Sequence, residues 1–264
     1  MNFTRFNDVL IHWRESGKPG APAIVLVNSL GTDCRMWDAV VPLLNDRWRV
    51  VSYDKRGHGL SDMPPGPYTI DDHADDLLAL ADHLKLEQFA LVGLSIGGVI
   101  AQTVALRQPK RLRALVLADT AAKIGNDESW NARINAIRDH GFESIADAIM
   151  ERWFSRGYRE ANLVELAGWR NMMLRTPVAG YIASCLALKS ADLTGDVTGI
   201  AVPTLVVTGA EDSSTPPELG RALADSIPGS RFVLIPASGH LPAIEQPAAL
   251  AALITRHMED NDHV

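Results

Sequence analysis

Short apolar runs alternate with amphipathic stretches over the first 120 residues of the chain. The runs at residues 23–27, 49–54, 89–94 and 113–119 have the length and the apolar content of buried strands. Residues 69–85 carry apolar side chains at helical spacing, and residues 96–109 predict a second helix that stops at Pro109. Residues 3–16 add a hairpin of two short strands around Asn7 and Asp8. The alternation predicts an α/β fold with a mostly parallel sheet and helices on both faces.

The alternation stops between residues 121 and 198, where one helical stretch follows another without a convincing strand. It resumes with strands in 203–212 and 231–240 and with helices in 216–227 and 248–258. Both ends of the helical block return to the same sheet, so we predict an inserted lid rather than a separate domain. Ligands bind outside the carboxyl ends of the strands in open α/β sheets, which is where such a lid would lie. The predicted division is a core of residues 1–120 and 199–264 and a helical lid of residues 121–198.

Composition and charge narrow the classes of function. The chain has 264 residues, of which 47% are hydrophobic, and a formal net charge of -7 with no basic run. This balance disfavours nucleic acid and anionic membranes as partners. Cys34 and Cys185 have no metal-type spacing, so we expect reduced, apolar cysteines and no metal site. No apolar run approaches the roughly 18 residues of a membrane span, and the N-terminus lacks an apolar signal core, so a cytoplasmic protein is expected. None of these features sets an oligomeric state.

A serine lies at the junction of a predicted strand and a predicted helix. The stretch Gly93-Leu94-Ser95-Ile96-Gly97 fits the pattern G-x-S-x-G, which is weak alone but is strengthened by the strand before it and the helix after it. A turn this sharp strains its central residue and requires neighbours that are nearly free of side chain. We predict that Ser95 is a nucleophile on such an elbow. The alternative is a bystander serine in a glycine-rich turn.

A serine hydroxyl is a poor nucleophile unless a base takes its proton. His240 is the best candidate, because it follows the last predicted strand in a loop bounded by Gly239 and Pro242. His58 also follows a strand and remains a rival, although its flanking glycines favour a structural turn. The other histidines are expected on a solvated helix face (His73, His83), near the chain end (His257, His263), in the opening hairpin (His12) or at the end of a lid helix (His140).

The base needs an acid that fixes its tautomer and offsets the charge it gains. Asp212 follows the strand in 203–209, and the order Ser95, Asp212, His240 is the one expected of an α/β-hydrolase. Its neighbour Glu211 is one rival. Asp119, at the end of another predicted strand, is the second.

Attack on a carbonyl creates an oxyanion, which backbone N–H groups stabilise. One donor is expected from Ile96, the residue after the nucleophile. The second is expected from Leu30, in the loop after the strand at 23–27. Many α/β-hydrolases carry His-Gly at the start of this loop, whereas this chain has Asn28-Ser29.

A set of strings along the whole chain resembles the 3-oxoadipate enol-lactonases of the α/β-hydrolase superfamily. The strings are "NSLGTD…MWD", "YDKRGHGLSD…GPYTIDD", "LVGLSIGG", "DESWNARI", "ERWF", "GYIASCLAL", "GAEDSSTPP" and "GHLPAIEQP". The elbow and the histidine loop are shared by the superfamily, while the lid strings point to the enol-lactonases. The resemblance implies an α/β-hydrolase fold and hydrolysis of a small anionic enol-lactone to 3-oxoadipate in protocatechuate and catechol breakdown. It implies an acyl-enzyme on Ser95 and no metal or organic cofactor.

A carboxylate on the substrate requires a cation inside a net acidic protein. The predicted lid offers seven arginines: Arg133, Arg138, Arg152, Arg156, Arg159, Arg170 and Arg175. Arg133 lies three residues after Trp130, so both project from one helix face and form a candidate clamp and wall. Trp153 is a further candidate for the pocket, although a lid tryptophan is more often core. The alternative for Arg133 is an ion pair with Asp127 or Glu128, or plain solvation.

Two other functions remain open on the same scaffold. The first is a different hydrolase, such as an esterase, another lactonase or a cofactor-free perhydrolase, because the fold does not fix the substrate. The second is a ligand receptor that kept the fold and turns over little or nothing.

Overall fold

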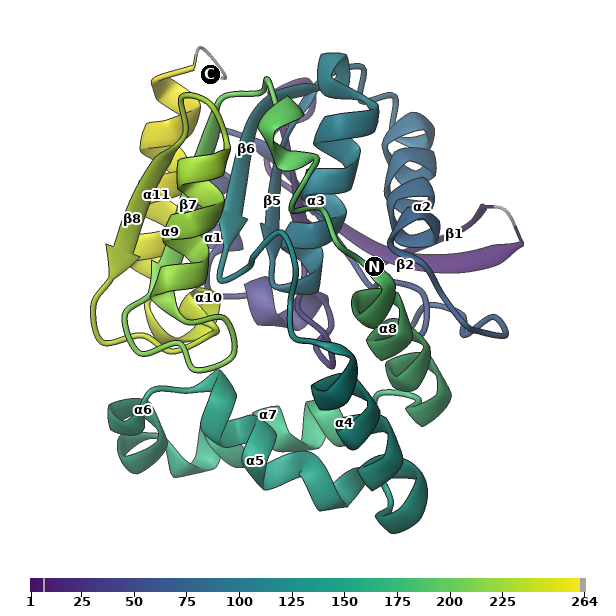
Figure 1. Ribbon diagram of the computed structural model, residues 1–264. Coiled ribbons are helices and arrows are strands. Elements are labelled where there is room, and N and C mark those ends of the chain that lie inside the picture. Colours follow the sequence, from purple (N-terminus) through teal and green to yellow (C-terminus); the bar gives the residue numbers. More distant parts are fainter. Residues whose placement is uncertain (7, 262–264) are drawn as a thin grey trace.

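The computed structural model describes residues 1–6 and 8–261, and its centre is one eight-stranded sheet (Figure 1). The strands are β1 (Asn2–Phe6), β2 (Val9–Ser16), β3 (Ala23–Val27), β4 (Arg49–Tyr53), β5 (Phe89–Leu94), β6 (Leu112–Ala118), β7 (Thr204–Gly209) and β8 (Arg231–Ile235). Their spatial order is β1-β2-β4-β3-β5-β6-β7-β8. Pairs β1–β2 and β2–β4 are antiparallel, and all the others are parallel. The predicted α/β class with a mostly parallel sheet is confirmed.

Helices cover both faces of this sheet. The longer helices of the sheet layers are α2 (Ile70–His83), α3 (Ile96–Arg107), α9 (Pro217–Ser226) and α11 (Pro247–Glu259), with short α1 (Val41–Leu44) and α10 (Pro242–Glu245). Four single turns of 3₁₀-helix lie at Cys34–Trp37, Pro109–Arg111, Phe142–Ile145 and Val197–Gly199. Helices α2, α3 and α9 lie on one face, and α1 and α11 lie on the other (Figure 1). Every residue of β3 and β5 is buried, which explains why these strands are continuous apolar runs.

The segment between β6 and β7 contains five helices and no strand. They are α4 (Asp127–His140), α5 (Ala146–Trp153), α6 (Arg156–Ala161), α7 (Leu163–Leu174) and α8 (Val178–Ser190). Helix α4 begins with a capping box between Asn126 and Ser129, and it ends before Gly141, whose φ of 82° suits a glycine. Figure 1 shows this layer at the end of the sheet to which the arrowheads of the parallel strands point. The segment predicted as a lid therefore faces the carboxyl ends of the strands.

The start of the chain forms the expected hairpin. Strands β1 and β2 pair as a hairpin, with Asp8 at a φ of 64°, while Asn7 lies outside the described residues. Among the described residues, no helix is both long and apolar enough to span a bilayer.

Candidate active site

Ser95 lies on a tight turn between β5 and α3. Its backbone angles are φ 60° and ψ -119°, a strained conformation for a residue with a side chain. Its N–H donates to the Ala118 carbonyl at 3.0 Å, and its carbonyl accepts the Thr120 hydroxyl at 2.8 Å, so β6 and the residues after it hold the strained turn in place. Gly93 and Gly97 have no room for a Cβ, which would collide with the carbonyls of Gly97 and Val27 respectively. The two glycines of the motif are thus a packing requirement of the elbow.

His240 and Asp212 form a buried pair in the loops after β8 and β7. The His240 Nδ1 lies 2.8 Å from Asp212 Oδ2. The same carboxylate accepts the Thr215 hydroxyl at 2.7 Å and the N–H groups of Ser214 and Thr215 at 2.7 and 3.1 Å. Burial alone would raise the pKa of Asp212, but His240 and the Thr215 bonds outweigh burial and lower it. Because an ionised carboxylate only accepts hydrogen bonds, His240 carries its proton on Nδ1 and keeps Nε2 free as a base.

The His240 loop is tied to the helical segment beyond the sheet. The His240 N–H donates to the Trp153 carbonyl at 3.0 Å. Glu245 accepts the Gly239 N–H at 2.8 Å and the Ser155 N–H at 3.0 Å, so one carboxylate joins this loop to the residues after α5. Burial raises the pKa of Glu245. The position of His240 therefore depends on helix α5 as well as on the sheet.

Ser95 and His240 line one cavity of about 80 Å³ beneath the helices. Five more of its lining residues matter here: Leu30, Trp130, Arg133, Arg152 and Trp153. All three substrate-binding candidates predicted from the sequence are in this set. The Trp130 Nε1–H donates to the Ile124 carbonyl at 2.7 Å, which fixes the indole in the wall. The small volume suits a compact substrate.

Two arginines bring positive charge to this cavity. The Arg133 guanidinium lies 4.8 Å from the centre of the Trp130 ring, as expected for residues on one helix face. Burial lowers the pKa of Arg152, and nearby Arg133 adds to the effect. In the described chain neither arginine forms an ion pair with a carboxylate, so the alternative of pairing with Asp127 or Glu128 is wrong for Arg133. Two adjacent unpaired cations favour an anionic ligand.

The two predicted oxyanion donors are the N–H groups of Ile96, which follows Ser95 in the chain, and of Leu30, in the loop after β3. Ile96 is the first residue of α3, so its N–H has no partner within the helix. Leu30 lines the cavity, and its N–H meets no acceptor in residues 1–6 and 8–261. Buried N–H groups without partners are rare, which makes these two amides candidates for binding an oxygen of the substrate.

The rivals for the base and the acid form other contacts. His58 is fully buried, and its Nε2 accepts the Gly31 N–H at 3.0 Å, so it supports a loop. Glu211 is exposed, and Asp119 accepts the Gly209 N–H at 2.8 Å.

The expected solvation of His73 is wrong, because this side chain is buried against the Tyr68 ring. The expected position of His257 at a frayed end is also wrong, since it is buried within α11, whereas His263 lies outside the described residues.

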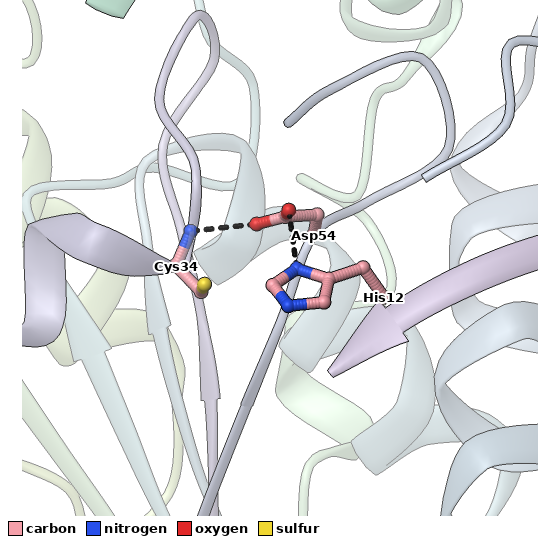
Figure 2. Close-up of side chains that lie close together, drawn as sticks. All are labelled: His12, Cys34 and Asp54. Atoms are coloured by element: carbon pink, nitrogen blue, oxygen red, sulfur yellow. Dashed lines mark hydrogen bonds and ion pairs between the residues drawn. The ribbon is translucent and has the colours of Figure 1, made fainter. Parts of the chain in front are cut away.

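Two clusters in the described chain bring potential metal ligands within 4.8 Å of one another. One contains the Asp212–His240 pair with Asp119, and the other contains His12, Cys34 and Asp54 (Figure 2). In the second cluster, Asp54 accepts from His12 Nδ1 and from the N–H groups of Cys34 and Leu60, each at 2.8 Å. Burial raises the pKa of the Cys34 thiol, which makes it a poor ligand. These contacts tie β2 to the turn at Cys34.

A larger cavity of about 700 Å³ lies beside this second cluster. It is lined by His12, Cys34, Asp54 and Arg175, among others, and contains neither Ser95 nor His240. Size therefore does not identify the reactive site in this protein. The smaller cavity is the candidate reactive site, because it brings together Ser95, His240 and two arginines without an ion pair.

A strained serine and a buried histidine–aspartate pair lie after parallel strands of an α/β sheet, and two free amides and an inserted layer of helices complete a candidate hydrolase site. The model of the α/β-hydrolase fold matches residues 22–247, and the chain belongs to this family.

Within the family the chain is similar to enol-lactonases. It is 36% identical to 3-oxoadipate enol-lactonase 2 of Acinetobacter baylyi, over 92% of this chain and 90% of that protein. It is 37% identical to enol-lactonase 1 of the same organism, over 88% and 86%. The crystal structure of the enol-lactonase from Burkholderia xenovorans LB400 superimposes with a TM-score of 0.95, 38% identity and coverage of 98% and 100%. The resemblance inferred from the motifs is confirmed, and the chain is a hydrolase.

Proposed function

We propose that the protein hydrolyses 3-oxoadipate enol-lactone, a five-membered lactone that bears a carboxymethyl group, to 3-oxoadipate during the breakdown of aromatic compounds. The observation that carries the proposal is the single cavity that contains Ser95, His240 and two unpaired arginines. The similarity to named enol-lactonases over about 90% of the chain supports the same substrate.

The chemistry follows from the groups in the cavity. His240 Nε2 takes the Ser95 proton while Oγ attacks the lactone carbonyl, and the tetrahedral oxyanion accepts the Leu30 and Ile96 N–H groups. The ring C–O bond then breaks and expels an enolate, which takes the proton from His240 Nε2 and becomes the ketone. An acyl group stays on Ser95. His240 then activates water, which adds to the acyl carbon, and Ser95 leaves with its proton restored.

Asp212 serves this cycle without touching the substrate. Its carboxylate is already held by Thr215 and Ser214, so it presents one oxygen to His240 in a fixed direction. The negative charge of Asp212 stabilises the His240 imidazolium that forms in both halves of the reaction.

The substrate test is direct. The unaltered protein is given the enol-lactone, and loss of the enol-lactone absorbance is followed together with the appearance of 3-oxoadipate. Turnover supports the proposal. Saturable binding without turnover would favour a receptor, and hydrolysis only of simple esters would favour a general esterase.

Arg133→Ala is expected to raise KM for the carboxylated lactone and to leave an uncharged ester almost unaffected. A charge-assisted hydrogen bond contributes about 1.5–3 kcal/mol, so kcat/KM for the lactone should fall roughly 10- to 100-fold. Arg138→Ala, exposed on the same helix, is the matched control and should change neither substrate. Initial rates on both substrates measure the effect. An equal loss on lactone and ester would remove Arg133 from the carboxylate site.

A further inference from the structure

Lys55 is a fully buried lysine that the proposed mechanism leaves without a role. It follows β4, and its Nζ donates to the carbonyls of Asn28 at 3.0 Å and Ser29 at 2.9 Å. Burial lowers the pKa of Lys55 and outweighs the opposite effect of Asp54 and Asp33, so that the pKa is about 7. A buried amine is costly unless its hydrogen bonds are satisfied. Both acceptors belong to the loop that carries the second oxyanion donor.

The direction of the Leu30 N–H is linked to this contact by covalent geometry. The Ser29 carbonyl and the Leu30 N–H belong to the same peptide unit, which is planar and trans, so they point in opposite directions. Lys55 is fully buried where it binds this carbonyl, which also accepts the Thr32 hydroxyl at 2.9 Å and the Thr32 N–H at 3.3 Å. The Leu30 N–H is thereby turned away from the interior, and Leu30 lines the cavity that also contains Ser95.

The next peptide is held by the same loop after β4. The Gly31 N–H donates to His58 Nε2 at 3.0 Å, and His58 Nδ1 lies 3.2 Å from the Arg56 carbonyl. Burial and nearby Lys55 lower the pKa of His58 well below its usual value, so the ring is neutral and able to accept a hydrogen bond. Rotation of the Ser29–Leu30 peptide would remove one acceptor from Lys55, while the Leu30–Gly31 peptide would stay bound to His58. The loop therefore has a strong preference for one orientation of the Leu30 amide.

We propose that Lys55 is a positioning residue for the oxyanion hole. Its two bonds to the loop carbonyls hold the Leu30 N–H in the direction that the transition state requires, and Lys55 itself does not contact the substrate. The inference rests on the proposed role of Ser95 as nucleophile.

Lys55→Met, which keeps chain length and removes the donors, tests this proposal. Loss of one oxyanion donor typically costs about 10²–10³ in kcat, so kcat should fall by that factor while KM changes little. A trifluoromethyl ketone that carries a carboxylate adds to Ser95 and places an oxyanion in the hole, and its affinity should fall in parallel with kcat. A saturated dicarboxylate of the length of 3-oxoadipate forms no oxyanion and should bind unchanged. The control is Lys123→Met, a surface lysine paired with Asp192.

Lys55→Gln keeps one donor group and should lose less activity than Lys55→Met, and it replaces that variant if Lys55→Met does not fold. An unchanged kcat in a folded variant overturns the proposal. So does an equal loss of affinity for the ketone and the dicarboxylate, which indicates general damage to the cavity. If the unaltered protein does not open the enol-lactone, the proposed function fails, whereas ketone affinity and turnover of p-nitrophenyl acetate still measure the effect of Lys55.

Discussion

Replacement of Ser95 by alanine is expected to abolish lactone hydrolysis. Loss of the nucleophile in a triad costs about 10⁶ in kcat, and what remains comes from the oxyanion donors and from substrate binding. The cavity itself should survive, because the Ser95 N–H and carbonyl hold the turn through Ala118 and Thr120 and the side chain takes no part. Absorbance of the enol-lactone measures the loss, and the melting temperature and dicarboxylate binding measure the integrity of the variant.

Stability gives this experiment a second readout. Alanine keeps the strained φ of 60° at position 95, whereas glycine adopts it freely. Ser95→Gly should therefore melt at a higher temperature than Ser95→Ala, and both should be inactive. Full activity in either variant would show that another group attacks the carbonyl. A further outcome is that the unaltered protein hydrolyses p-nitrophenyl acetate but not the lactone, while both variants hydrolyse neither. That result would support Ser95 as the nucleophile and would contradict only the proposed substrate.

The elements that position the site were predictable because they rest on local pattern. Apolar runs and helical spacing determine the strands and helices, and the carboxyl ends of parallel strands meet at one edge of a sheet. Residues in the turn after β5 and in the loops after β7 and β8 were therefore expected to converge. Ser95, Asp212 and His240 are such residues, and the structure brings them to one region.

The parts that were not predictable depend on contacts between distant segments. His73 is polar and lies on an amphipathic helix, yet it is buried against Tyr68, and burial lowers its pKa to about 3. Arg152 was one of seven lid arginines, and only the tertiary arrangement of the lid helices brings it beside Arg133. Lys55 carries no local signal of a buried role. A lysine after a strand is usually solvated, and its two acceptors come from a loop more than 20 residues earlier.

The choice between Asp212 and Asp119 shows the same limit, since both follow strands and both carry a carboxylate. The geometry separates them, because Asp212 faces His240 Nδ1 at 2.8 Å whereas Asp119 accepts the Gly209 N–H. Burial raises the pKa of Asp119 well above its usual value, and nearby Asp212 raises it further. Of two carboxyl groups so close, ionisation of one disfavours ionisation of the other, so the raised pKa of Asp119 favours its protonated form beside an ionised Asp212.

Asp212→Asn is therefore expected to reduce kcat by about 10⁴, because an amide in place of the carboxylate fixes the wrong tautomer of His240 and does not offset its charge. Asp119→Asn is the matched control. An amide resembles a protonated carboxyl in size and polarity, so this variant should keep kcat within about tenfold and should not move the acidic limb of the pH profile. If Asp119 were ionised, loss of its charge would shift that limb to lower pH. The reverse ranking of the two variants, with Asp119→Asn inactive and Asp212→Asn active, would make Asp119 the acid of the triad.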